Sequence, residues 1–367
     1  MPGIYVHIPF CVKKCNYCDF ASYPCLLEKS DEYITALCNE TETYKGEKAD
    51  TVYFGGGTPS ILDAKCLFRV MEAVQSVFDV SKNAEITIEV NPGTVTPDKL
   101  KDIRSIGFNR VSLGSQTFSD SELEILGRIH TSRQTLKCYA DVRNAGFNNV
   151  SLDLMYAIPG QNMKSLSTSV MQVLKLSPEH ISCYGLKFEP DTPFYDRLER
   201  GELSEKSDDE YADMYAMIVQ MLNSEGYSQY ELSNFSRPGF ESRHNMKYWL
   251  LQDYIGLGLG ASSCYNGKRY TNSTDFDEYV TSFKKAEYFE LTTDDKMSEY
   301  MILSLRLTNL GANKSEFEKR FGIPMTDVFG KAIRKHLSTG MLRDCGDRIV
   351  LSKNAYYVSN SVLCDFI

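Results

Sequence analysis

The sequence predicts a mixed α/β fold, in which a partial barrel of six strand–helix units is followed by a small helical domain. Over about the first 190 residues, short segments rich in β-branched residues alternate with longer amphipathic segments. This alternation is typical of parallel strands joined by right-handed helical crossovers. Glycine, proline and polar residues follow the strand-like segments, at the end where such sheets carry their functional loops. We therefore expect a TIM-like (β/α)6 barrel with its site at the carboxyl ends of the strands.

The expected elements can be placed along the chain. The predicted strands cover residues 3–9, 51–54, 84–90, 110–115, a part of 150–161 and a segment that begins at residue 180. The predicted barrel helices cover residues 31–44, 63–78, 97–106, 119–126, 132–145 and 164–176. A charged helix is expected over 208–226, and helices over 294–306, 314–321 and 325–339 precede a hairpin that turns at Gly346. This last pattern predicts a winged-helix-like domain, and the expected domains are 1–190, 191–290 and 291–367.

Composition excludes several classes of function. The 367-residue chain has a net charge of −9 and a pI near 5.3, without a long basic stripe, so nucleic acid is not an expected partner. The N-terminus has no leader pattern, and no apolar run reaches about 18 residues. Eleven cysteines that show no disulfide spacing favour a reducing compartment, so we expect a cytoplasmic protein.

Three cysteines near the N-terminus have the spacing of metal ligands. Cys11, Cys15 and Cys18 form C-x3-C-x2-C, and three thiolates this close together can hold three irons of a cubane cluster. The fourth iron then lacks a local ligand and is open to a small molecule. A structural zinc site would need a second Cys/His pair, which the sequence does not offer, and chance clustering is the other alternative.

The stretch YVHIPFCVKKCNYCDF resembles the radical S-adenosylmethionine (SAM) superfamily, in which SAM chelates the open iron of a [4Fe–4S] cluster. Within that superfamily it is similar to the branch of oxygen-independent coproporphyrinogen dehydrogenase (HemN) and the heme chaperone HemW. By this resemblance, Cys11, Cys15 and Cys18 would bind the cluster, and Tyr5 and the backbone around Tyr17 would flank the cluster and SAM.

Further motif residues follow the predicted strands. Taken singly, the glycine turn 55–59 could be a tight strand-to-helix turn, and each polar residue could be a capping, surface or ion-pairing residue. The resemblance implies that together they bind SAM, with Arg128 opposite its carboxylate and Glu89 on its ribose. The implied SAM-binding residues are Tyr5, Tyr17, Gly56, Gly57, Thr58, Glu89, Gln116, Arg128 and Asp153.

A second informative stretch, HNMKYW at 244–249, contains the only tryptophan. A histidine beside large aromatic rings could bind a porphyrin, or it could be a satisfied histidine in an aromatic corner. H-N-x-x-Y-W resembles the heme-binding motif of HemW proteins, which implies heme contacts from His244, Asn245, Tyr248 and Trp249. Ser242 stands where this family often has cysteine, so His244 becomes the expected axial ligand. The glycine-rich segment 256–263 could wall the site or only pack tightly.

The resemblance is closest to HemW, because Phe20 stands where the dehydrogenase is expected to carry a further cysteine, and because only ten residues precede Cys11. It implies a SAM- and [4Fe–4S]-binding heme chaperone that transfers heme to hemoproteins. The alternative is a coproporphyrinogen III dehydrogenase or another porphyrin-directed radical SAM enzyme. Coproporphyrinogen dehydrogenase activity is not expected, and cleavage of SAM is left open. Heme and acceptor hemoproteins are the expected partners. Peripheral membrane association and a homodimer are left open.

Overall fold

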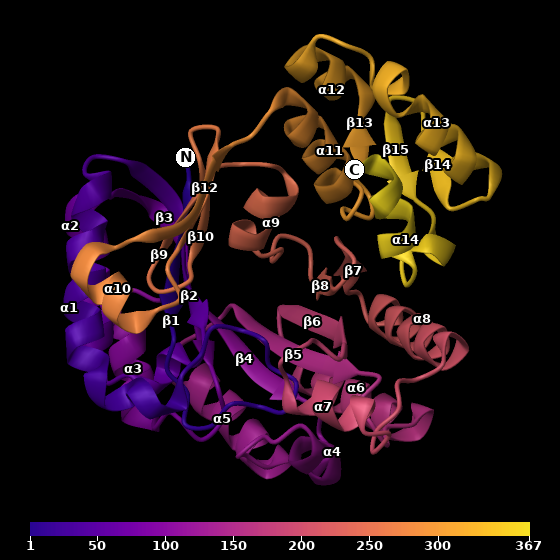
Figure 1. Cartoon of the computed structure of the whole chain (residues 1–367). Helices are drawn as coiled ribbons and strands as arrows, with labels where there is room; N and C mark the ends of the chain where they lie inside the picture. The colour runs from indigo at the N-terminus through magenta and orange to yellow at the C-terminus, as the bar shows by residue number, and fades with distance from the viewer.

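The computed structural model describes residues 1–367 and confirms the predicted fold class. Six parallel strands lie side by side in chain order in one twelve-stranded sheet (Figure 1). These strands are β1 (Gly3–Ile8), β2 (Lys48–Gly56), β3 (Asp79–Val90), β4 (Arg110–Gln116), β5 (Val150–Tyr156) and β6 (His180–Gly185). Their right-handed helical connections produce the partial barrel.

Helices pack on the outer face of these strands. They are α1 (Ser30–Thr41), α2 (Ala64–Val77), α3 (Pro97–Ile106), α4 (Asp120–Ile125), α5 (Ser132–Asn144) and α6 (Met163–Leu176). Local capping explains why their starts were predictable. Thr96 caps α3 with Pro97 in its first turn, and Thr131 and Gln134 form a capping box on α5. Short 3-10 turns occupy Pro24–Lys29, Glu42–Tyr44, Pro59–Ile61, Lys353–Ala355 and Cys364–Phe366.

Residues 191–290 extend the barrel sheet at both of its edges. Strand β8 (Asn234–Ser236) pairs antiparallel with β6, whereas β9 (Tyr254–Leu257) pairs parallel with β1. Further antiparallel strands continue the β9 side, and β7 lies outside β8. The other elements of this region are α7 (Pro193–Glu199), α8 (Asp208–Ser224), β7 (Ser228–Gln229), α9 (Arg243–Trp249), β10 (Ser262–Tyr265), β11 (Lys268–Asn272), α10 (Phe276–Ser282) and β12 (Lys285–Glu290).

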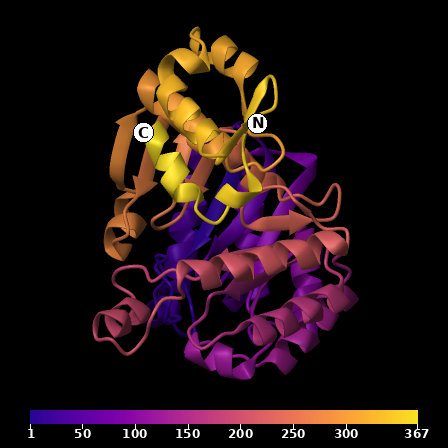
Figure 2. The same ribbon diagram turned by 90° about the vertical axis from the view of Figure 1, so that its right-hand side faces the viewer.

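The C-terminal domain combines helices with a small sheet of order β13-β15-β14, as the sequence predicted. Its elements are α11 (Thr293–Ser304), β13 (Ala312–Asn313), α12 (Lys314–Phe321), α13 (Met325–Ser338), β14 (Leu342–Asp344), β15 (Arg348–Leu351) and α14 (Ser359–Leu363). Figure 2 shows this domain at one end of the molecule, with the barrel helices at the other. One core cluster of 71 buried residues includes side chains of both parts, so the domain is packed onto the barrel.

None of the helices combines the length and the apolar character needed to cross a membrane.

Candidate functional site

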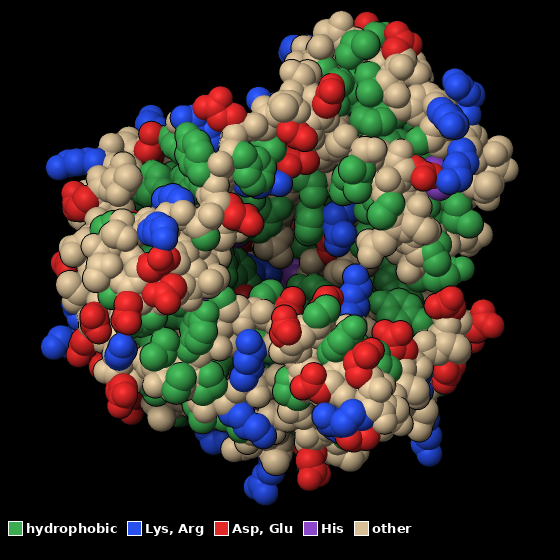
Figure 3. Space-filling model, viewed as in Figure 1, with side chains coloured by type: hydrophobic (Ala, Val, Ile, Leu, Met, Phe, Trp, Pro, Cys, Tyr) green, Lys and Arg blue, Asp and Glu red, His purple; other side chains and the backbone are tan.

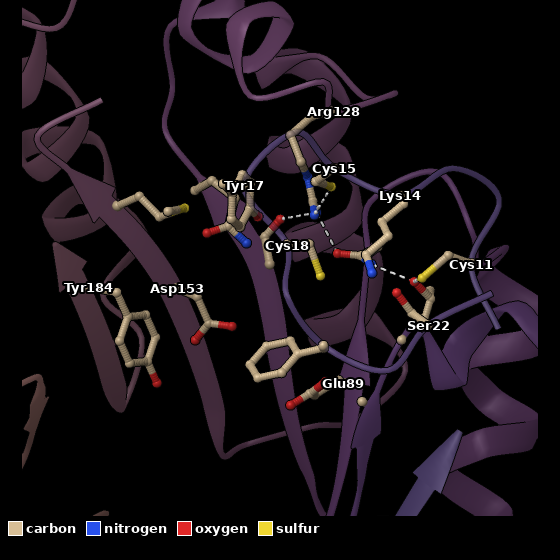
Figure 4. A pocket seen from close by; sticks show the side chains of 18 of the residues that line it. Cys11, Lys14, Cys15, Tyr17, Cys18, Ser22, Glu89, Arg128, Asp153 and Tyr184 are labelled. Atoms are coloured by element: carbon tan, nitrogen blue, oxygen red, sulfur yellow. Dashed lines mark hydrogen bonds between the residues drawn. The ribbon is translucent and has the colours of Figure 1, made fainter. Parts of the chain in front are cut away.

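A cavity of about 520 Å³ lies at the carboxyl ends of the barrel strands, and we call it the mouth cavity (Figure 4). Its wall combines the cysteine loop with inward-facing side chains of β2 to β6. It contains every residue predicted to bind the cluster or SAM except Tyr5. The predicted residues in its wall are Cys11, Cys15, Cys18, Tyr17, Gly56, Gly57, Thr58, Glu89, Gln116, Arg128 and Asp153.

The cysteine loop is fixed to the barrel by hydrogen bonds. Cys11 Sγ lies 3.5 Å from Thr58 Oγ1, and Arg128 Nη1 donates to Cys15 Sγ at 3.5 Å. All three cysteines are free, and burial raises the pKa of the Cys11 and Cys18 thiols. A bound metal would therefore have to displace their protons.

The three thiols fit a cluster better than a single ion. A tetrahedral zinc needs its ligands to converge on one point. No group of three or more His, Cys, Asp or Glu side chains converges in that way. Figure 4 shows the three sulfur atoms standing apart around one space, as thiolates that each bind a different iron would be. The donor set therefore suits the predicted [4Fe–4S] cluster, with Cys11, Cys15 and Cys18 as its protein ligands.

The glycine motif brings β2 and the cysteine loop into close contact. A Cβ on Gly57 would lie 2.7 Å from Phe10 O and 3.1 Å from Cys11 Sγ. Gly56 has a φ of +108°, and a Cβ there would collide with the His7 ring at 2.5 Å. Packing within the protein thus accounts for both glycines, and the same absence of side chains leaves backbone exposed in the mouth cavity.

Two partly buried carboxylates, Glu89 and Asp153, line the mouth cavity. Burial raises the pKa of Glu89 to about 7, although Glu89 Oε1 accepts a 2.9 Å hydrogen bond from the Tyr53 hydroxyl. Burial also raises the pKa of Asp153, which accepts bonds from Ser112 Oγ at 3.1 and 3.2 Å. Glu89 is thus placed to accept hydroxyl groups of a ligand.

Arg110 belongs to this site, and the sequence analysis missed it. Its side chain is only 2% exposed, it lines the mouth cavity, and its Nε has no hydrogen-bond partner. Its charge lowers the pKa of both Glu89 and Asp153 against the larger effect of burial. Alternate residues of β4 line the cavity: Arg110, Ser112, Gly114 and Gln116. That period of two was the one signal in the sequence for Arg110.

Arg128 and Gln116 hold the rim of the mouth cavity. Arg128 Nη2 donates to Gly114 O at 2.9 Å and to Asn91 Oδ1, besides its bond to Cys15. Gln116 ends β4 with a positive φ of 60°, after a register shift that begins at Leu113. This bulge turns the end of the strand toward the cavity.

Tyr5 occupies a different position from the other predicted residues. It is paired with Tyr53 across β1 and β2, and the two rings stack with centroids 6.3 Å apart. Its hydroxyl lies 3.1 Å from His7 Nδ1. Tyr5 therefore lies beside Tyr53, which lines the mouth cavity, and borders a second cavity on the other side.

The HNMKYW motif forms α9, which packs against the amino ends of β1 to β3, away from the cysteine loop. Lys247 Nζ contacts Asp50 Oδ1 at 2.6 Å and Met1 O at 2.9 Å. The His244 amide donates to Glu85 Oε1 at 3.1 Å. In Figure 1, α9 lies between the sheet and the C-terminal domain.

His244 is fully engaged within the protein. Its ring is 1% exposed, with Nδ1 at 2.9 Å from Thr51 Oγ1 and Nε2 at 2.8 Å from the Tyr248 hydroxyl. It also stacks on Tyr53, with centroids 5.3 Å apart. Burial, followed by the charges of Lys247 and Arg110, lowers the pKa of His244 to about 3, so the ring is neutral. Neither nitrogen is free for iron in this arrangement.

The four predicted heme contacts are divided among three environments. Asn245 lines the mouth cavity, whereas Tyr248 and Trp249 line the second cavity, and His244 is buried in the protein. Ser242 accepts a 3.4 Å bond from the Asn245 amide and caps α9, which explains a hydroxyl side chain at that position.

Comparison with known proteins agrees with the site. Residues 5–171 match the model of the Radical SAM superfamily, and residues 291–358 match the HemN C-terminal domain. The chain is 36% identical to the heme chaperone HemW of Lactococcus lactis, over 99% of this chain and 96% of that protein. It is 34% identical to HemW of Bacillus subtilis, over 100% and 99% of the two chains.

A solved structure of coproporphyrinogen III oxidase (HemN) from Escherichia coli superposes with a TM-score of 0.86 at 23% identity. The match covers 100% of this chain and 90% of that one, and it shows a shared fold. Together, the full-length relatives and the family models assign this chain. It belongs to the radical SAM superfamily and, within it, to the family of the heme chaperone HemW.

Proposed function

We propose that this protein is a heme chaperone that binds a [4Fe–4S] cluster and SAM in the mouth cavity, holds heme, and transfers it to hemoproteins. The observation that carries the proposal is the mouth cavity itself, where three free cysteines of one loop face Glu89, Arg128 and Asp153. The HemW relatives, which extend over the whole chain, supply the heme-chaperone assignment.

In this proposal the protein's own residues position the cofactors. Cys11, Cys15 and Cys18 would hold the cluster, and Arg128 would keep the loop in place through its bond to Cys15. Gly56, Gly57, Thr58, Glu89, Gln116, Arg128 and Asp153 would contact SAM, with Tyr17 beside them. When bound, the cluster and SAM supply one-electron chemistry to the site.

Heme would be contacted by Tyr248 and Trp249 of α9, which are exposed to a cavity. Ligation of the iron by His244 stays a prediction, and it requires that one ring nitrogen give up its contact with Thr51 or with Tyr248. We also place the protein in the cytoplasm, since all eleven cysteines are free. A homodimer and peripheral membrane association stay predictions, to be checked by sizing and by flotation with vesicles.

The proposal is tested under anaerobic conditions with the full chain. The cluster is reconstituted, hemin is titrated, and the heme-loaded protein is mixed with an apo-hemoprotein. We expect stoichiometric hemin binding and transfer, and SAM should perturb the cluster spectrum of wild type but not of Cys15→Ser. Incubation with coproporphyrinogen III and SAM serves as the opposing assay. Turnover to protoporphyrinogen, or absence of hemin binding, would contradict the chaperone.

A further inference from the structure

A second cavity, of about 790 Å³, lies between α9, strands β9 to β11 and helix α11, and we call it the side cavity. Figure 1 places these elements between the barrel and the C-terminal domain, and Figure 3 shows the molecule hollowed between those two parts. Its volume falls within the range of small-molecule sites. The Radical SAM model ends at residue 171 and the HemN C-terminal model begins at residue 291. Most of the residues that line the side cavity lie between these two positions, outside both models.

The wall of the side cavity carries flat aromatic rings. Tyr248 packs edge-on against Tyr254 with centroids 4.7 Å apart, and Trp249 follows at 6.5 Å from Tyr248. Phe20, in the segment after the last cluster cysteine, is 64% exposed and lines the same cavity. Trp249 Nε1 is buried without a hydrogen-bond acceptor. Such a wall suits a planar apolar ligand.

Positive charge lines the same cavity. Arg269, Lys296 and Arg320 contribute three cations, against the carboxylates of Asp253 and Glu299. Only Arg269 is ion-paired, through Nη1 to Glu299 Oε1 at 2.7 Å, and its Nε is buried without a partner. Lys296 and Arg320 on α11 and α12 are thus available to carboxylates of a ligand.

One soft donor atom stands among these groups. Cys264 of β10 is paired with Tyr254 of β9 and with Arg269 of β11, so the three side chains share one face of the sheet. Burial raises the pKa of the Cys264 thiol, and the charge and hydrogen bond of Arg269 act against that effect. His7 also borders the cavity, but its Nε2 bonds to Ala21 O at 2.7 Å and its Nδ1 to Tyr5. The Cys264 sulfur is therefore the soft donor that this wall offers to iron.

We propose that the side cavity is the heme site, with the ring between the aromatic side chains, Cys264 on the iron, and the propionates on Lys296 and Arg320. This inference rests on the proposed heme function and locates it. It differs from the sequence expectation, because the axial ligand comes from β10 rather than from His244. It also gives heme a cavity distinct from the mouth cavity, although Phe20 lines both.

The test uses the full chain with its cluster reconstituted, so that the cluster cysteines do not capture hemin. Hemin is titrated anaerobically into wild type, Cys264→His and Cys264→Ala, and the axial ligand is identified by EPR of the ferric form. We expect the EPR spectrum of thiolate-ligated ferric heme in wild type and that of imidazole-ligated heme in Cys264→His. Cys264→Ala should show neither spectrum. Cys345→Ala, at an exposed thiol of the C-terminal hairpin, is the matched control and should behave as wild type.

A second pair of variants tests the propionate anchor without touching the core. Arg320→Glu should weaken hemin binding by about fivefold to tenfold, whereas Lys319→Glu, an exposed neighbour outside the cavity, should leave it unchanged. An unchanged axial signature in both Cys264 variants, or equal affinities in the two charge reversals, overturns the assignment of this site. Failure of wild type to bind hemin would instead refute the proposed function itself.

Discussion

The hydroxyl of Tyr53 donates a 2.9 Å hydrogen bond to Glu89 Oε1. The same phenol ring stacks on His244, whose Nε2 lies 2.8 Å from the hydroxyl of Tyr248. Glu89 lines the mouth cavity, and Tyr248 lines the side cavity. Four side chains in contact therefore connect the proposed SAM site to the proposed heme site through the interior of the barrel.

Glu89 makes the stability of the fold depend on pH. Its pKa is about 7 in the folded protein and near 4.5 when exposed, because burial disfavours the charged form. Between these values the unfolded chain loses a proton that the folded chain keeps. Stability from this group is thus full below about pH 4.5 and is lost as the pH rises toward 7, by up to about 1.4 kcal/mol per pH unit.

Glu89→Gln removes this dependence, so its unfolding free energy should rise relative to wild type from about pH 5 to about pH 7. Urea denaturation at several pH values, on samples of equal cluster content, measures the difference. Glu124→Gln, at an exposed position of α4, is the matched control. Parallel behaviour of the two variants would contradict the elevated pKa of Glu89.

His244 should remain neutral throughout the physiological range. Its pKa is lowered to about 3, below the usual 6.5, so folding loses stability from this group as the pH falls from about 6.5 toward 3. With selectively labelled imidazoles, NMR should find no titration of His244 between about pH 8 and pH 5. The chain in urea, where the ring is exposed, gives the control titration. A midpoint near 6 in the folded protein would show that the ring is open to solvent.

The regular part of this fold could be predicted from the sequence because its signals are local. The Thr96 cap and Pro97 mark the start of α3. The three cysteines Cys11, Cys15 and Cys18 occur within eight consecutive residues, so their pattern is visible in the sequence. The mouth-cavity residues were predicted through the resemblance to the radical SAM superfamily, and the position of several of them near the ends of parallel strands agreed with it.

Other features depend on partners distant in the chain. His244 is satisfied by Thr51, 193 positions earlier, and no local pattern announces that contact. Arg110 begins β4, at the opposite end of the strand from the predicted residue Gln116, and only the period of two along the strand relates the two positions. The side cavity combines Cys264 on an antiparallel strand with cations of the C-terminal domain, such as Arg320, and only the tertiary fold brings these together.

The glycine-rich segment 256–263, whose role the sequence left open, is anchored by a buried carboxylate. Glu40, only 1% exposed, accepts hydrogen bonds of 2.8 Å from Gly258 N, Asn272 Nδ2 and the Tyr279 hydroxyl, and pairs with Lys285 at 3.4 Å. Glu40→Ala leaves these donors and the lysine without their shared partner. We expect a loss of about 3–5 kcal/mol in the unfolding free energy, measured by chemical denaturation.

Glu42→Ala, two residues further at an exposed position, should change stability by less than about 0.5 kcal/mol. An equally small loss of unfolding free energy in Glu40→Ala would contradict this prediction. It would mean that water replaces the carboxylate without cost and that the hydrogen bonds of Glu40 do not hold segment 256–263 against α1.

Gly57 should control retention of the cluster as well as stability. The Gly57 amide donates to Ile8 O at 2.8 Å, and an added methyl group would meet Phe10 O at 2.7 Å, Ile8 O at 2.9 Å and Cys11 Sγ at 3.1 Å. Both oxygens belong to the backbone, so the cysteine loop itself must move. Gly57→Ala should therefore cost about 1–3 kcal/mol and lower the iron content per chain after reconstitution.

The matched control is Gly330→Ala in α13, where the methyl group would meet only the flexible end of Arg334. That variant should gain up to about 1 kcal/mol from helix propensity and keep its full iron content. Iron analysis and thermal denaturation of both variants separate a local effect on the loop from a general loss of stability. Full iron retention in Gly57→Ala would mean that the loop accommodates the methyl group, and that close packing of Gly57 does not position Cys11.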